Sequence, residues 1–191
     1  LALRTQVVKK DSDISYHHGR VLYSFLSEYI RKSSASSLNI VETGTARGFS
    51  ALCMAKALSD SNVFGKIVTF DILPHASPIY WNNVTDTTIG KLSRIELLEA
   101  WTSLIEKYVL FVTGDTRNLL DKYSMGRVHF AFFDGSHSYN DVIFEFNSIK
   151  NKQKSGDIIV YDDYSKEHYP DIVKAVDYNC EKYSYSMELI S

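Results

Sequence analysis

The stretch NIVETGTARGFSALCMAKAL, residues 39–58, decides the fold class of this chain. It opens with a short apolar run, passes through a loop that carries Gly44 and Gly48, and leads into a helical pattern that begins around Ser50. Glycines let the backbone approach a ligand closely, and the first turn of a helix offers unpaired N–H groups. The stretch therefore predicts a strand, a ligand-approach loop and a helix in succession.

Outward from this stretch, short apolar runs alternate with helical patterns along the chain. The runs are rich in branched and aromatic residues without period-two alternation, which is typical of strands buried on both faces. Crossover helices between such strands predict an α/β fold, a doubly wound Rossmann-like sheet that is mostly parallel, with helices on both faces. The expected strands are 38–41, 66–70, 109–113, 128–133 and 157–161, and the expected helices are 21–30, 50–58, 89–106, 139–150 and 171–178.

After the last expected helix, only one more strand-like run is present, over 183–190. The family that the motifs quoted below resemble usually closes its sheet with an antiparallel pair of strands, so we expect that pair to be incomplete here or cut. An unpaired sheet edge is a template for association. A homodimer in which a partner subunit covers this edge is therefore one expectation.

A length of 191 residues predicts one domain, with an N-terminal helical cap or substrate segment over 1–37 and a cofactor-binding core over 38–191. The 21 Lys and Arg residues nearly balance the 23 Asp and Glu residues, and the net charge of -2 argues against a nucleic-acid partner. No apolar run is long enough to span a bilayer, and the N-terminus lacks a signal-peptide core, so we expect a cytoplasmic protein.

The glycine loop does not match the common phosphate-binding motifs. A dinucleotide fingerprint needs glycines where Ala46 and Phe49 stand, and a P-loop needs a lysine after Gly48. What remains is ExGxxxGxS, with Glu42 two residues ahead of the first glycine. A carboxylate there would repel a pyrophosphate but suits a cationic ligand such as S-adenosylmethionine.

Two further acids follow the next strands. Asp71 ends the second expected strand, where a carboxylate can accept both ribose hydroxyls of a nucleoside, in a methyltransferase or in a dehydrogenase. Asp115 follows the third strand, and two roles stay open for it: a contact to an adenine amino group, or a cap on the next helix.

Five motifs, in their order along the chain, resemble those of the class I S-adenosylmethionine-dependent methyltransferases, in particular the macrocin-type sugar O-methyltransferases. They are VETGTARGFS, VTFDI, FFDGSHSYNDV, SGDIIVYDDY and YPDIVKAVD. The resemblance runs from about Asn39 to Asp177. It implies that the glycine loop holds the methionine part of the cofactor and that the acid after the second strand holds its ribose. The implied cofactor residues are Glu42, Gly44, Thr45, Gly48, Ser50, Asp71, Asp115 and Asp134.

Asp134, Asp162 and Asp163 follow the fourth and fifth expected strands and should converge at one edge of the sheet. Three carboxylates in one cleft repel each other unless they are protonated or bridged by a cation. Hard oxygen ligands favour Mg²⁺ or a similar divalent ion, and the resemblance also implies a metal site there. The structural alternatives are a helix N-cap for Asp134 and a solvated turn for the pair.

His137 lies three residues beyond Asp134, and an imidazole can accept a proton near neutral pH. The resemblance implies that His137 is the general base beside Asp134. The alternative is that His137 is a loop histidine that only forms a hydrogen bond with the end of the sheet. The sequence thus favours metal-assisted O-methylation of a small hydroxylated acceptor such as a sugar or natural product. A NAD-dependent oxidoreductase and a non-catalytic binding module remain the alternatives.

Overall fold

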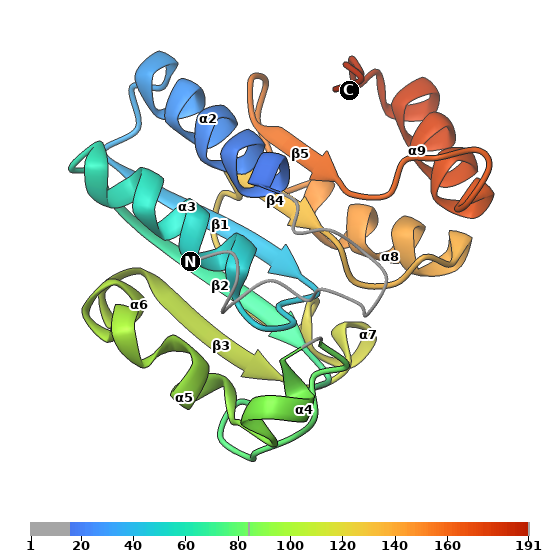
Figure 1. Cartoon of the computed structure of the whole chain (residues 1–191). Helices are drawn as coiled ribbons and strands as arrows, with labels where there is room; N and C mark the ends of the chain where they lie inside the picture. The colour runs from blue at the N-terminus through green and yellow to red at the C-terminus, as the bar shows by residue number, and fades with distance from the viewer. Residues whose placement is uncertain (1–15, 84, 191) are drawn as a thin grey trace.

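The fold is built on a parallel five-stranded sheet. The computed structural model describes residues 16–83 and 85–190. In Figure 1 the strand arrows point the same way, and the strand order is β3-β2-β1-β4-β5. This confirms the doubly wound α/β prediction. The strands are β1 (Ser37–Thr43), β2 (Phe64–Asp71), β3 (Val109–Thr113), β4 (Phe130–Phe133) and β5 (Ile158–Tyr161).

The register brings the residues that follow β1, β4 and β5 to one level. Thr43 at the end of β1 pairs with Phe133 at the end of β4, and Phe133 pairs with Tyr161 at the end of β5. The strand order reverses between β1 and β4, and ligands of doubly wound sheets bind outside the carboxyl ends of the strands at such a point. Asp134 and Asp162 therefore leave the sheet side by side at this edge.

Helices cover both faces of the sheet, each over its own apolar core. Leu26, Met54, Ile67 and Phe130 belong to the core of one face, and Val68, Phe133 and Ile149 to that of the other. No helix of the described residues is long and apolar enough to cross a membrane. One face carries α2 (Tyr16–Lys32), α3 (Phe49–Asp60) and α6 (Thr102–Tyr108); the other carries α7 (Thr116–Leu119), α8 (Tyr139–Lys150) and α9 (Pro170–Tyr183).

Two expected elements differ in the structure. The helix predicted over 89–106 is broken into pieces, because Gly90 takes a positive φ of 79° and Ser93 starts a new helix with a capping box to Glu96. The strand predicted over 183–190 is wrong: α9 continues to Tyr183, and the described residues after it form no strand. The pieces of the first helix are α4 (Asp86–Ile89), α5 (Arg94–Leu98) and η1 (Glu99–Trp101), followed by α6.

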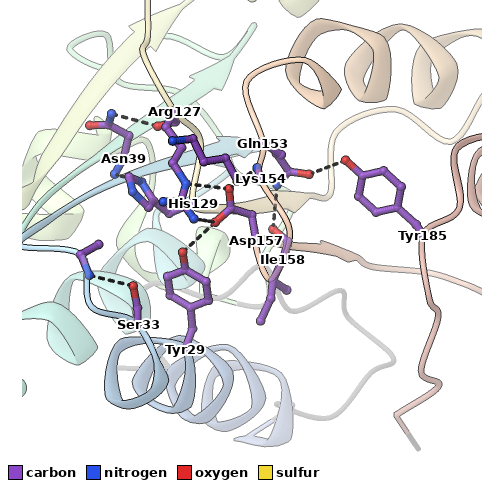
Figure 2. Close-up of polar contacts among 11 residues, drawn as sticks. Tyr29, Ser33, Asn39, Arg127, His129, Gln153, Lys154, Asp157, Ile158 and Tyr185 are labelled. Atoms are coloured by element: carbon purple, nitrogen blue, oxygen red, sulfur yellow. Dashed lines mark hydrogen bonds and ion pairs between the residues drawn. The ribbon is translucent and has the colours of Figure 1, made fainter.

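A polar cluster at the opposite edge of the sheet ties α2 to the start of β5 (Figure 2). The side chain of Asp157 accepts hydrogen bonds from Tyr29 Oη at 2.8 Å, from Arg127 Nη2 at 2.7 Å and from Arg127 Nε at 2.9 Å. Nearby, Nδ1 of His129 accepts the backbone N–H of Asn39 at 3.0 Å. These contacts hold the first described helix against the sheet, far from the strand ends that carry the acids.

Candidate functional site

The glycine loop crosses directly over the chain that leaves β4. Gly44 has a φ of 82°, and a Cβ atom there would lie 1.9 Å from the carbonyl oxygen of Asp134. Gly48 has a φ of 92° and stands at the N-cap of α3, with no side-chain cap. Both glycines are thus needed for the path of the backbone itself. The close approach of Gly44 packs the loop against Asp134.

Glu42 lies inside β1 rather than in the loop after it, because the pairing of β1 with β2 and β4 continues to Thr43. Its side chain is fully buried, and Oε1 accepts a hydrogen bond from the Ser50 hydroxyl. Burial raises the pKa of Glu42 to about 7, although the bond from Ser50 opposes the rise. Oε2 has no hydrogen-bond partner within the part of the chain that the structure describes. One buried carboxylate oxygen beneath the loop is therefore available to a cationic group.

Asp71, the last residue of β2, binds the glycine loop and a buried arginine. Its Oδ2 accepts the backbone N–H of Ala46 at 2.6 Å and lies 3.2 Å from Arg94 Nη2, and its Oδ1 accepts the N–H of Leu73 at 2.8 Å. Arg94 is only 1% exposed and also donates from Nε to the carbonyl of Ala46 at 2.7 Å. The sequence does not single out Arg94, because it sits in a stretch predicted as one continuous helix.

The remaining predicted cofactor residues are engaged within the protein. The hydroxyl of Thr45 bonds that of Thr69 in the neighbouring strand. Asp115 is exposed and caps α7, since its Oδ1 accepts the backbone N–H of Arg117 at 2.8 Å. Of the two roles considered for Asp115, the structure contains the cap; the contact to adenine stays a prediction.

Asp134 stands at the centre of the acidic edge. Its oxygens belong to two groups of potential metal ligands whose atoms all lie within 4.8 Å of one another: His18, Asp134 and Asp162, and Asp134, His137 and Asp163. Among the described residues the three aspartates alone do not form such a group. Burial, together with the charges of Asp162 and Asp163, raises the pKa of Asp134 to about 9. Such a carboxyl group keeps its proton at neutral pH unless a positive charge comes close.

Two histidines lie close to Asp134, each in one of these two groups. Nε2 of His137 lies 2.9 Å from Oδ2 of Asp163, and its ring stacks on Tyr169 with the centroids 4.5 Å apart. In the other group, Nδ1 of His18 lies 3.4 Å from Oδ2 of Asp162. No sequence motif distinguishes His18 from its neighbour His17. His17 is exposed, whereas the side chain of His18 is 24% exposed and reaches the strand ends.

A small pocket that is open to solvent lies between the loop after β4 and helices α8 and α9. Glu145 lies in its wall and is 1% exposed, and burial raises its pKa to about 7. The sequence offers a signal for this residue: Val142, Phe146 and Ile149 mark the apolar stripe of α8, and Glu145 falls on it. The cavity is lined by Phe133, Asp134, Gly135, Ser136, His137, Val142, Glu145, Tyr161, Asp162 and Ile172.

Comparisons with known proteins agree with this architecture. Residues 41–164 match the model of a family described as a methyltransferase domain. No curated protein matches the chain in sequence. The O-methyltransferase NovP has a similar structure, with a TM-score of 0.71 and 19% identity over 93% of this chain and 76% of its own.

Two other solved structures share the fold. CalS11, a TDP-rhamnose 3'-O-methyltransferase of calicheamicin biosynthesis, gives a TM-score of 0.65 and 16% identity, over 92% of this chain and 76% of its own. The methyltransferase PaMTH1 of Podospora anserina, bound to SAH, has a TM-score of 0.57 and 17% sequence identity, over 95% of this chain and 75% of its own. At these identities the likeness is one of fold.

Proposed function

This chain belongs to the methyltransferase domain family, and from that premise we propose that it transfers the methyl group of S-adenosylmethionine to a hydroxyl oxygen of a small acceptor such as a sugar or a natural product. The observation that carries the proposal is the placement of Asp134 between two carboxylate–histidine groups, at the edge where the strand order reverses. Such an edge is where doubly wound folds bind their ligands.

The residues present fit a cationic cofactor. The buried Oε2 of Glu42 lacks a partner among the described residues, and a ligand with an ammonium group would satisfy it. We propose that Glu42, Gly44, Thr45, Gly48 and Ser50 form the wall toward the methionine part, and that Asp71 lies toward the ribose. Arg94 holds Asp71 and the carbonyl of Ala46 in fixed positions, so it acts as a positioning residue for that wall.

The acidic edge also fits a divalent cation. Asp134, Asp162 and Asp163 would hold it, because a cation offsets the burial and the repulsion that together keep Asp134 protonated. When bound, the cofactor supplies an electrophilic methyl group on its sulfonium, and a divalent ion such as Mg²⁺ favours ionisation of a nearby hydroxyl. The remaining step, acceptance of the proton of the acceptor hydroxyl, belongs to the side chains around Asp134.

His137 would accept the proton of the acceptor hydroxyl. Because Asp163 accepts the N–H of Nε2, the neutral imidazole carries its lone pair on Nδ1, and Nδ1 is the atom that takes the proton. The imidazolium formed is then stabilised by the carboxylate of Asp163, while the stacked ring of Tyr169 holds the imidazole plane. Holding nucleophile and methyl group in contact is worth roughly 7–11 kcal/mol of barrier.

A transfer assay tests the proposal. Full-length protein, radiolabelled S-adenosylmethionine and a panel of sugar and phenolic acceptors are incubated with Mg²⁺ or with excess EDTA. We expect labelled ether products that depend on the divalent ion. Full activity in EDTA would remove the metal from the proposal, and transfer only to amines would overturn O-methylation. A homodimer and a cytoplasmic location also remain proposals, which size-exclusion chromatography and localisation of the tagged protein test.

A further inference from the structure

His18 reaches the acidic edge from outside the segment that matches the methyltransferase family. That segment covers residues 41–164, whereas His18 is carried by α2. Its Nδ1 approaches Oδ2 of Asp162 to 3.4 Å, and the two side chains form, with Asp134, a group whose ligand atoms all lie within 4.8 Å of one another. The helix that precedes the first strand thus supplies a nitrogen to a group whose other two ligand atoms are carboxylate oxygens.

The position of His18 is fixed by the packing of α2 on α3. At the next residue, Gly19, a Cβ atom would lie 2.5 Å from the ring of Phe49 and 2.7 Å from Sγ of Cys53, so the two helices touch closely here. The imidazole itself meets the rings of Phe132 and Phe49 edge-on, with centroid distances of 5.4 and 6.1 Å. An imidazole held in this way presents Nδ1 toward the aspartates without a large loss of side-chain entropy on binding a ligand.

A second observation points to a cation at the same place. Glu145 lies with Asp134 and Asp162 in the wall of the cavity; its side chain is 1% exposed, and Oε1 has no hydrogen-bond partner within the described residues. A buried carboxylate oxygen without a partner is costly unless positive charge compensates it. Glu145 therefore adds to the demand for a cation next to Asp134.

We propose that His18 Nδ1, Asp134 and Asp162 together hold a divalent transition-metal ion such as Fe²⁺, Co²⁺ or Mn²⁺ in preference to Mg²⁺. Imidazole nitrogen suits transition metals, whereas Mg²⁺ favours oxygen ligands almost exclusively. In this ligand set His18 takes the place that the proposed function gives to Asp163, and Asp163 then serves as the partner of His137 in proton acceptance. The inference rests on the proposed function, since it concerns the metal of the same site.

The test uses the metal alone and reads binding directly. Full-length protein is stripped with chelator and titrated with Co²⁺ and with Mg²⁺ by calorimetry, and ¹⁴N couplings are measured by pulsed EPR on the Mn²⁺-loaded protein. The variant is His18→Gln, which keeps bulk against Phe132 but replaces the nitrogen by an amide. The matched control is His17→Gln, one residue away and exposed. Circular dichroism confirms that both variants are folded.

We expect the wild type to bind Co²⁺ more tightly than Mg²⁺. His18→Gln should weaken Co²⁺ at least about tenfold, change Mg²⁺ affinity by less than about threefold, and abolish the ¹⁴N coupling. His17→Gln should match the wild type in all three readouts. Co²⁺ affinity and coupling that survive in His18→Gln would overturn the proposal, as would a wild type that prefers Mg²⁺.

Binding of S-adenosylhomocysteine, measured in the same samples, separates this inference from the proposed function. If the wild type binds S-adenosylhomocysteine while Co²⁺ affinity is indifferent to His18, the ligand role of His18 fails and the methyltransferase proposal stands. If S-adenosylhomocysteine does not bind at all, the proposed function fails whatever the metal data show.

Discussion

Gly44 is the residue at which the glycine loop and the acidic edge meet. A Cβ atom there would lie 1.9 Å from the carbonyl oxygen of Asp134, and its φ of 82° is unfavourable for other residues. We expect Gly44→Ala to lower the free energy of unfolding because of both the steric clash and the positive φ. The loss should be at least about 2 kcal/mol larger than that of a Gly→Ala substitution at a site with a positive φ but no clash. Urea unfolding of the purified variants measures the difference.

Gly156 provides the matched control. Its φ is 89°, but a Cβ atom there would have no neighbour within 4 Å. Gly156→Ala should therefore show only the cost of the left-handed conformation, about 1–2 kcal/mol. Equal destabilisation by the two substitutions would mean that the loop moves freely away from Asp134.

Replacement of His137 by alanine tests the proton acceptor. We expect His137→Ala to lower kcat by about 10²- to 10⁴-fold, the usual contribution of a general base, with the Kd of S-adenosylhomocysteine nearly unchanged. His168→Ala is the control, since His168 is exposed and also lies beside Tyr169. A loss confined to cofactor affinity would contradict the assignment of His137 as base.

At the scale of single residues, the sequence predicts which acids meet but not how each is used. Asp134 and Asp162 converge as expected, because parallel strand ends share one edge. The internal partners of Asp71 could not be predicted, since Arg94 reaches it from 23 residues further along the chain. The approach of His18 to Asp162 could not be predicted for a similar reason, because it depends on how α2 packs against α3, which no local pattern encodes.

At the scale of elements, the contact between α2 and β5 depends on one ionised carboxylate. Asp157 accepts hydrogen bonds from Arg127 and Tyr29 (Figure 2), and its side chain is fully buried. Burial opposes ionisation, but the bonds from Arg127, the Lys154 amide and Tyr29 outweigh it, so the pKa of Asp157 is lowered. A carboxyl group whose pKa is lower in the folded state stabilises that state at pH values above its pKa in the unfolded chain, which is about 3.9. This contribution is lost as the pH falls from that value through the lowered pKa of the folded state.

We therefore expect Asp157→Asn to lower the free energy of unfolding by about 2 kcal/mol at pH 7, the usual range for hydrogen bonds to a charged group. The difference from the wild type should shrink as the pH falls below about 4, because the wild-type carboxylate is then protonated too. Urea unfolding at several pH values measures this, with the exposed Asp121→Asn as control. A difference that stays constant with pH would assign the effect to packing.

The elements themselves were largely predictable where burial dictates them. The strand over 109–113 and the helix over 139–150 have the predicted bounds, since continuous apolar runs and a regular stripe leave few alternatives. The wrong prediction at the C-terminal end concerns mostly exposed residues. The segment 183–190 has the branched and aromatic composition of a strand, but α9 extends to Tyr183, and Ser184 then turns the chain in a left-handed conformation with a φ of 58°.

At the scale of the whole molecule, the net charge of -2 hides an uneven distribution of acids. Asp134, Asp162, Asp163 and the buried Glu145 surround one cavity or its rim, and Glu42 and Asp71 lie at the adjacent strand ends. Charges gathered in a low-dielectric cleft attract a cation far more strongly than the same charges spread over the surface. The overall balance is thus compatible with a cationic cofactor and a metal ion at one edge of the sheet.

A thermal shift measured on the full-length protein distinguishes the methyltransferase from a dinucleotide-binding protein of the same fold. A ligand present at 100 times its Kd stabilises the folded state by about 2.7 kcal/mol, which for a chain of this length raises Tm by roughly 5–10 °C. We expect this shift with S-adenosylhomocysteine and none with NAD⁺, because Ala46 and Phe49 occupy the glycine positions of the dinucleotide fingerprint. A shift with NAD⁺ alone would instead assign the glycine loop to a pyrophosphate, and the buried carboxylate of Glu42 would then need another partner.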